Sequence, residues 1–211
     1  LGIHESQSRL WENNVGRSLE FWKYNYDSLK SIFPNQLSDV TVDDFYKAAN
    51  NIKPSLIRTN ADELTYHLHV LIRYEIEKAL IEGKIIVKDL PEIWNLKYYE
   101  YLELEVPCDA LGVLQDIHWS HGSFGYFPTY TIGSFYAAQF FNQAKVENPN
   151  LLKEIEDGNN KNLLNWLRKK IHNNGKRLDA DKLCEKISGE KLNFKYFKEY
   201  VIEKYSKIYS L

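Results

Sequence analysis

The chain has 211 residues, of which 44% are hydrophobic and 27% charged. This composition is typical of a globular protein and excludes disordered, collagen-like and coiled-coil chains. No run approaches the roughly 18 uninterrupted apolar residues of a membrane helix, so no membrane partner is expected. With only two cysteines and no apolar signal segment, we expect a cytoplasmic protein with free thiols.

The net charge of -2 conceals an uneven distribution of charge along the chain. Residues 1–160 carry 14 Lys+Arg and 23 Asp+Glu, whereas residues 161–211 carry 13 and 6. The two segments therefore have net charges of -9 and +7. A basic segment can contact nucleic acid, but it is more often a solvated helix face. The overall balance does not favour nucleic acid as a partner.

The first predicted element is a helix from the start of the chain to about residue 26. Trp11, Val15 and Trp22 fall on one apolar stripe, and a polar stripe runs beside it. No capping residue precedes Leu1, and the chain contains no Met. The pattern therefore predicts that this chain is a piece of a longer protein.

Two further helices are predicted before residue 90. The first covers residues 43–50 and can be capped by Ser38, Asp39 or Thr41. The second begins at Asn60, where Glu63 completes a capping box, and ends at Gly83. Its apolar residues cover more than one face, so we expect it to be central and largely buried.

The remaining pattern is helical apart from one short run. Residues 84–88 favour a β-strand or hairpin arm, and residues 120–128 are Gly- and aromatic-rich and indicate a loop. Helices are predicted over 91–104, 129–146, 149–157, 160–173, 179–188 and 193–209. The predicted fold class is all-α with at most one small β element, and no domain boundary is visible.

One candidate for chemistry is the segment from His4 to Ser8, His-Glu-Ser-Gln-Ser. It lacks the second His of a His-Glu-x-x-His zinc helix, in which two imidazoles lie one turn apart. Glu5 could still serve as one metal ligand, with Ser6 and Ser8 as its hydrogen-bond partners. The alternative is an exposed Glu on an exposed stripe, and the spacing alone favours that alternative.

The second candidate is Arg58, just before the predicted helix N-terminus. A guanidinium beside free backbone N–H groups forms a recess for a carboxylate, and Asp62 could hold the guanidinium in place. Arg58 could equally neutralise an acidic side chain within the fold. The sequence leaves both interpretations open.

The third candidate is the segment 112–130, which combines His, Asp and Tyr in a Gly-rich loop. Such loops can hold donors toward a reacting carbonyl. Asp116 could orient His118, and His118 with His121 could alternatively bind a metal. Aromatic loop packing is the plain alternative, and we favour it for His121.

A pair of histidines also lies on the helix predicted to begin at Asn60. His67 and His69 are two residues apart and face different directions, so they cannot chelate one metal together. At least one of them is expected to be a hydrogen-bonded core residue.

Taken together, the three candidate segments resemble the carboxypeptidase Taq family, also called the thermostable carboxypeptidases. They read GIHESQSRLWENNVGRS, IRTNADELTYHLH and GVLQDIHWSHGSFGYFPTY. They match the family's His-Glu-Ser-x-Ser, Ile-Arg-x-x-Ala-Asp and Gly-x-x-Gln-Asp-x-His-Trp motifs in the same order. The resemblance covers essentially all 211 residues.

The resemblance implies a mainly helical, zincin-like metallocarboxypeptidase with a deep groove, which releases C-terminal residues from peptides and often forms homodimers. The resemblance also implies a metal cofactor, Zn²⁺ or another divalent ion such as Co²⁺. In this family a His-Glu-x-x-His helix lies upstream of the first motif. Residues 1–211 are therefore expected to be a C-terminal portion of the catalytic domain, whose partner is the missing N-terminal portion.

The resemblance also assigns roles to individual residues. Glu5 becomes the third metal ligand, and Arg58, with Asp62 and Gln115, binds the substrate's terminal carboxylate or organises the groove. His118, with Tyr126 or Tyr130, stabilises the oxyanion. Alone, the chain is expected to bind little metal and to be inactive. The alternative is a non-catalytic helical module that binds peptide C-termini.

Overall fold

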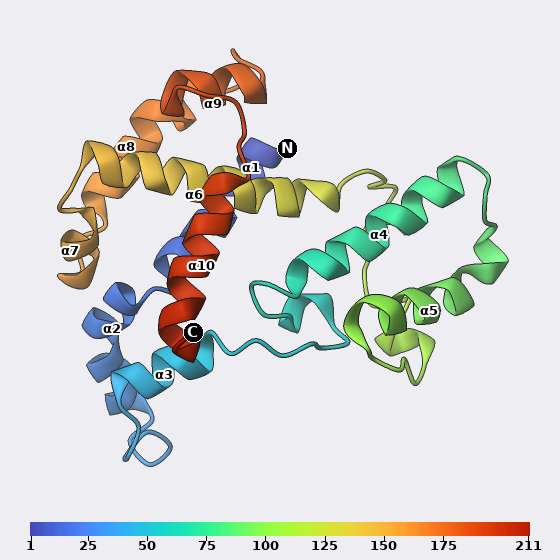
Figure 1. Ribbon diagram of the computed structural model, residues 1–211, viewed down its shortest axis with the longest axis horizontal. Coiled ribbons are helices and arrows are strands. Elements are labelled where there is room, and N and C mark those ends of the chain that lie inside the picture. Colours follow the sequence, from blue (N-terminus) through green and yellow to red (C-terminus); the bar gives the residue numbers. More distant parts are fainter. The chain divides into compact units, whose positions relative to one another are not determined.

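A computed structural model describes residues 1–211 and shows an all-helical protein, which confirms the predicted fold class (Figure 1). The α-helices are α1 (Gly2–Arg9), α2 (Leu19–Ile32), α3 (Val42–Ala49), α4 (Tyr66–Ile81), α5 (Leu90–Leu102), α6 (Pro128–Glu147), α7 (Leu151–Glu156), α8 (Lys161–Lys170), α9 (Ala180–Ser188) and α10 (Lys195–Tyr209). No helix is both long enough and apolar enough to span a bilayer.

The β-prone run at 84–88 is not a strand. Its end enters a short 3₁₀ turn, Val87–Asp89, that leads directly into α5. A strand needs a neighbour to satisfy its backbone N–H and C=O groups. No second strand exists in the chain, so the β propensity of this run has nothing to pair with.

The chain forms two compact units, although its sequence shows no boundary between them. Unit 1 contains residues 1–49 and 132–211, and unit 2 contains residues 50–131. The second crossing point lies within α6, an unbroken helix, rather than in a Gly- or Pro-rich linker. This position explains why composition and linker signals do not reveal the division.

Unit 1 is built around one apolar core contributed by the N-terminal segment and by α6 to α9. Leu10, Phe140 and Leu167 are fully buried within it. Helix α2 packs on both α3 and α7. Thr41 caps α3, since its Oγ1 accepts from the Asp44 N–H while Asp44 accepts from the Thr41 N–H.

The first predicted helix is interrupted, contrary to the expectation of one helix to residue 26. After α1 the chain forms a π-helix, Leu10–Val15, in which the Gly16 N–H donates to the Trp11 carbonyl at 2.8 Å. Ser18 then adopts an extended conformation and caps α2 by accepting from the Phe21 N–H. Because Ser18 starts a new helix, the apolar stripe predicted for residues 1–26 does not lie on one continuous helix.

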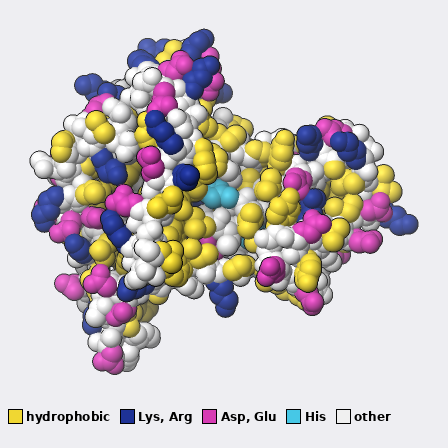
Figure 2. All heavy atoms as spheres, in the orientation of Figure 1, with side chains coloured by type: hydrophobic (Ala, Val, Ile, Leu, Met, Phe, Trp, Pro, Cys, Tyr) yellow, Lys and Arg dark blue, Asp and Glu magenta, His cyan; other side chains and the backbone are white.

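Unit 2 consists mainly of α4 packed on α5, with Ile72, Ile76 and Trp94 in its core. Apolar side chains also reach its surface (Figure 2). Leu114 and Ile117 are among the exposed apolar residues of this unit. Helix α4 begins six residues later than predicted because Asp62 binds the N–H groups of Leu64 and Thr65 and the residues just before the helix form a turn. The predicted end is confirmed, since Gly83 follows α4 with φ of 67°.

Candidate active site

Glu5 lies in unit 1 on α1, where it is only 8% exposed. Gly133 of α6 makes this burial possible, because a Cβ on Gly133 would lie 2.8 Å from the Glu5 Cβ. Ser8 donates to Glu5 Oε2 at 3.2 Å, as predicted, whereas Ser6 donates to the Ile3 carbonyl. The expectation of an exposed Glu5 is therefore wrong, and so is the expected contact with Ser6.

The residues of this chain do not complete a metal site around Glu5. A catalytic zinc typically has three protein ligands, and nowhere in the chain do three His, Cys, Asp or Glu side chains gather. His118 Nε2 lies 3.1 Å from the Tyr130 hydroxyl, and His121 Nδ1 lies 3.0 Å from Ser123 Oγ. No third His, Cys, Asp or Glu side chain joins this pair, so it does not complete the alternative metal site either.

Arg58 lies in unit 2 within a 3₁₀ turn, Arg58–Asn60, and its side chain is buried. Its Nε and Nη2 both donate to Asp116 Oδ1, at 2.9 and 2.7 Å, and Nη1 donates to the Tyr66 hydroxyl. The expected contact with Asp62 is absent. Asp62 instead accepts from the backbone N–H groups of Leu64 and Thr65, just before α4, and from that of Lys53.

Gln115 holds the backbone next to Arg58. Its Oε1 accepts from the Arg58 N–H at 2.9 Å, and its Nε2 donates to the Leu56 carbonyl at 3.1 Å. Asp62 and Gln115 therefore both bind main-chain groups on either side of the Arg58 turn. In the structure both residues hold this turn. Their substrate contacts, which the resemblance implies, stay a prediction.

Asp116 is shared between two arginines, and the sequence reasoning missed the second one. Arg73 of α4 is fully buried, and its Nε donates to Asp116 Oδ2 at 2.6 Å. Burial disfavours the charged carboxylate, but the charges of Arg73 and Arg58 outweigh it and lower the pKa of Asp116. An Arg among the apolar residues of a predicted buried helix was the signal that could have revealed it.

His118 is bonded to one of the two candidate tyrosines. Its Nε2 lies 3.1 Å from the Tyr130 hydroxyl, while the Tyr126 ring lies beside it with 5.8 Å between ring centroids. Its Nδ1 is 3.9 Å from Asp116 Oδ1, too far for the predicted orienting hydrogen bond. Burial, followed by the charge of Arg58, lowers the pKa of His118, so the ring is largely neutral at pH 7.

A second buried charge on α4 holds the loop that carries His118. Glu77 Oε1 accepts from Trp119 Nε1 at 2.8 Å and from the Gly125 N–H at 3.0 Å. Both donors lie in the 112–130 segment, Trp119 just before the Gly-rich stretch 120–128 and Gly125 within it. Glu77 thus anchors the loop to the helix, a role that the sequence reasoning also missed.

The histidine pair on α4 has separate partners, as predicted. His67 Nδ1 lies 3.0 Å from Thr131 Oγ1, and His69 Nδ1 lies 3.1 Å from the Tyr98 hydroxyl. His69 is fully buried. Its burial, and then the charge of Arg73, lower its pKa to about 3.

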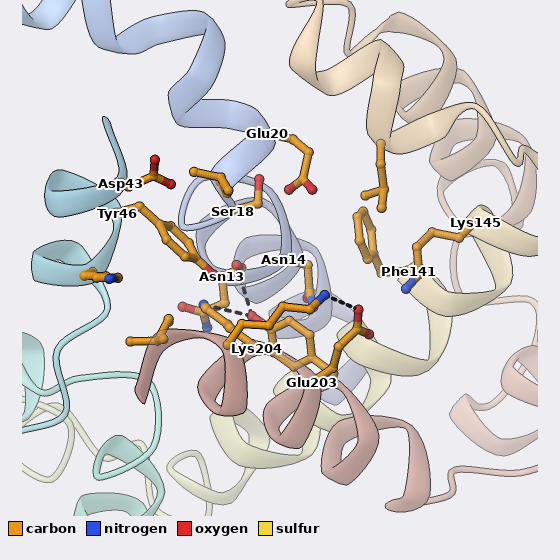
Figure 3. Close-up of a pocket in the computed structure, with 16 residues that line it drawn as sticks. Asn13, Asn14, Ser18, Glu20, Asp43, Tyr46, Phe141, Lys145, Glu203 and Lys204 are labelled. Atoms are coloured by element: carbon orange, nitrogen blue, oxygen red, sulfur yellow. Dashed lines mark hydrogen bonds and ion pairs between the residues drawn. The ribbon is translucent and has the colours of Figure 1, made fainter. Parts of the chain in front are cut away.

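A cavity of about 300 Å³ lies in unit 1, away from every predicted site residue (Figure 3). Asn13 and Asn14 of the π-helix meet Glu203 and Lys204 of α10 there. Lysines and acidic residues both line it, so the cavity selects no single charge of ligand. Its lining is Asn13, Asn14, Ser18, Leu19, Glu20, Asp43, Tyr46, Lys47, Phe141, Lys145, Leu152, Tyr200, Glu203, Lys204, Lys207 and Ile208.

Comparison with known proteins agrees with these motifs. The profile of the Carboxypeptidase Taq (M32) metallopeptidase family matches residues 1–205. The chain is 44% identical over 211 residues to Carboxypeptidase 1 of Bacillus subtilis, covering 100% of this chain and 42% of that protein. It is 46% identical over 209 residues to Thermostable carboxypeptidase 1 of Thermus thermophilus, covering 99% and 41%.

Solved structures of the same family also match this chain. The M32 carboxypeptidase from Deinococcus radiodurans R1 is 42% identical, with a TM-score of 0.94 over 100% of this chain and 42% of that one. A buried carboxylate on α1 and an Arg–Asp–Arg cluster beside a His–Tyr pair thus occur in a helical protein related to metallopeptidases. The chain belongs to the carboxypeptidase Taq (M32) metallopeptidase family. It spans about two-fifths of the length of these relatives.

Proposed function

We propose that this chain is the C-terminal portion of a metallocarboxypeptidase that releases amino acids from the C-termini of peptides. The observation that carries the proposal is the cluster in unit 2. There Arg58, a candidate carboxylate ligand, and His118, a candidate oxyanion donor, both approach Asp116 Oδ1, at 2.7 and 3.9 Å. A carboxypeptidase needs both groups near each other, because it cleaves one peptide bond away from the terminal carboxylate.

In this proposal Arg58 binds the terminal carboxylate of the peptide. Arg58 and Arg73 carry two positive charges against the one negative charge of Asp116, so the trio has a net charge of +1. A positive, largely buried cluster favours an incoming carboxylate. Asp62 and Gln115 contribute by holding the backbone around Arg58.

His118 and Tyr130 form the proposed oxyanion pair. A neutral imidazole bonded to a phenol can present a polar hydrogen to the negative charge that develops on the scissile carbonyl oxygen. The hydrogen bond between them favours Tyr130 over Tyr126 as the direct partner. Tyr126 packs beside the His118 ring and limits its movement.

Glu5 is the proposed metal ligand from this chain. Its burial on α1 and its hydrogen bond from Ser8 suit a carboxylate that is held in one orientation. We propose that the remaining ligands are the two histidines of a His-Glu-x-x-His helix in the N-terminal portion, with Zn²⁺ or Co²⁺ as the ion. A cytoplasmic location and a homodimeric assembly belong to the same proposal.

The test compares this chain with the complete polypeptide that carries the His-Glu-x-x-His helix. Metal content and release of C-terminal amino acids are measured on both, and Glu5→Gln is made in the complete protein. We expect metal and activity in the complete protein, little of either in the 211-residue chain, and loss of metal in Glu5→Gln. A metal-loaded complete protein that cleaves no peptide from its C-terminus would refute the proposal.

The second candidate function is a non-catalytic module that binds peptide C-termini. The same Arg58 cluster would then hold the carboxylate without hydrolysis. Calorimetry with a peptide and its C-terminally amidated form separates the two functions. A complete protein that binds the free acid tightly, discriminates against the amide and releases no amino acid would favour the binding module.

A further inference from the structure

Arg73 has no role in the function proposed above beyond its charge, yet it is among the largest fully buried side chains of the protein. Burying an arginine is costly unless each donor finds a partner. Its Nε donates to Asp116 Oδ2 at 2.6 Å, and its Nη1 donates to the His69 carbonyl at 2.9 Å. Its guanidinium also lies over the Trp94 ring, 4.6 Å from the centroid. These contacts hold Arg73 in one position.

We propose that Arg73 is a positioning residue for substrate recognition, which acts by holding the carboxylate of Asp116 so that Asp116 in turn aims Arg58. The inference rests on the proposed function of Arg58. It adds a residue from outside the three sequence motifs to that site.

The geometry of Asp116 carries this inference. Arg73 occupies one carboxylate oxygen, Oδ2, while Arg58 occupies the other, Oδ1, through both Nε and Nη2. A carboxylate held at both oxygens by planar guanidinium groups cannot rotate about its own axis without breaking one set of bonds. The orientation of the Arg58 guanidinium is therefore set by a residue that Arg58 does not need to touch.

Electrostatics supports the same role. With Arg58 alone, Asp116 would neutralise the cation that is needed for the peptide carboxylate. Asp116 pairs with Arg73 as well as with Arg58, so its single negative charge does not neutralise both arginines. The cluster therefore keeps a net positive charge. Arg73 thus maintains both the direction of Arg58 and its attraction for an anion.

Glu77 provides a matched control on the same helix. It lies one turn after Arg73 and anchors the 112–130 loop through Trp119 and Gly125. Glu77→Gln weakens the anchor at Trp119 and Gly125 but keeps the separate hydrogen bonds by which Arg58 and Arg73 hold Asp116 in the same loop. A general loosening of the loop and a specific loss of Arg58 positioning therefore give different results.

The experiment measures KM and kcat of the complete protein with a peptide that has a free C-terminus. We expect Arg58→Ala, Arg73→Met and Arg73→Lys each to raise KM about tenfold, because a charge-assisted hydrogen bond or its alignment is lost. The double variant Arg58→Ala/Arg73→Met should stay within about twofold of Arg58→Ala, because Arg73 acts through Arg58. Glu77→Gln should lower kcat with little change in KM.

Each alternative outcome has a distinct meaning. If Arg58→Ala leaves KM unchanged, the proposed function of Arg58 fails. If Arg58→Ala raises KM but both Arg73 variants do not, this inference fails and the proposed function stands. If the increases in KM multiply in the double variant, Arg73 does not act through Arg58 and is only a structural residue. The same follows if Glu77→Gln raises KM as much as Arg73→Met does. Arg73→Lys retains the charge, so it carries the test if Arg73→Met does not fold.

Discussion

The cluster of Arg58, Asp116 and Arg73 influences the charge state of the histidines beside it. Asp116 accepts from Arg58 and Arg73, and the two guanidinium groups together outweigh its negative charge. Both arginines lower the pKa of the nearby His69 and His118, after the larger effect of burial. The site therefore holds its histidines neutral, ready to exchange hydrogen bonds rather than to carry charge.

The buried His69 predicts a pH dependence of stability. Its pKa is about 3 in the folded protein, below the usual 6.5, so the unfolded chain binds a proton that the folded chain excludes. This contribution is fully present above about pH 6.5 and is lost as the pH falls toward 3. We expect His69→Gln to flatten the slope between about pH 5 and 6.5, by up to about 1.4 kcal/mol per pH unit.

Urea unfolding of the chain at several pH values measures this slope. His4→Gln, which changes an exposed histidine on α1, is the matched control and should keep the slope of the unmodified chain. Equal slopes for His69→Gln and the unmodified chain would show that His69 titrates normally in the folded state.

At the scale of elements, the contact between α1 and α6 places Glu5. Gly133 has no side chain, and a Cβ there would lie 2.8 Å from the Glu5 Cβ and 2.9 Å from the Glu5 carbonyl carbon. Arg9 of α1 also donates to Ser134 Oγ of α6. The two helices therefore meet closely at the point where the candidate metal ligand lies.

Gly133→Ala should separate these helices. Alanine favours a helix over glycine by about 1 kcal/mol, but overpacking against backbone atoms costs about 1–3 kcal/mol. We expect a net loss in the free energy of unfolding of roughly 1 kcal/mol, together with weaker metal binding in the complete protein. Urea unfolding and metal titration measure the two effects.

Gly2→Ala is the matched control for this substitution. A Cβ on Gly2 would meet only side-chain atoms, the nearest being Ile132 Cγ2 at 3.1 Å, which can move aside. Gly2→Ala should therefore change stability less. If Gly133→Ala stabilised the chain and left metal affinity intact, the close approach of α1 and α6 would not be what places Glu5.

At the scale of the whole molecule, the chain combines two compact units with exposed apolar side chains. In unit 2, Leu114 and Ile117 are 71% and 70% exposed, and both lie in the segment that carries His118. Exposed apolar residues that gather in one segment favour association. The 211-residue chain is therefore predicted to self-associate in solution.

Sedimentation velocity at increasing protein concentration measures this association. The double variant Leu114→Lys/Ile117→Lys should shift the distribution toward the monomer, because it places charge on the associating segment. Ile202→Lys, on an exposed residue of α10 in unit 1, is the control and should have a smaller effect. A compact monomer at every concentration would contradict the prediction.

The sequence by itself determined most of the helices and the motifs of this protein. Local features were sufficient for these, because apolar periodicity, the Thr41 cap and the glycine after α4 act within a few residues. The start of α4 was misplaced because Asp62 holds the residues just before the helix in a turn, and the capping pattern at Asn60 does not reveal this.

Only the tertiary structure decided which side chains meet. Arg73 and Glu77 lie on a helix predicted to be buried, but the sequence does not name their partners, which lie 43 and 42 residues away, at Asp116 and Trp119. The burial of Glu5 depends on Gly133, far along the chain. Such pairings depend on long-range packing, which no local pattern encodes. The site's motifs were therefore visible in the sequence, whereas its network of charges was not.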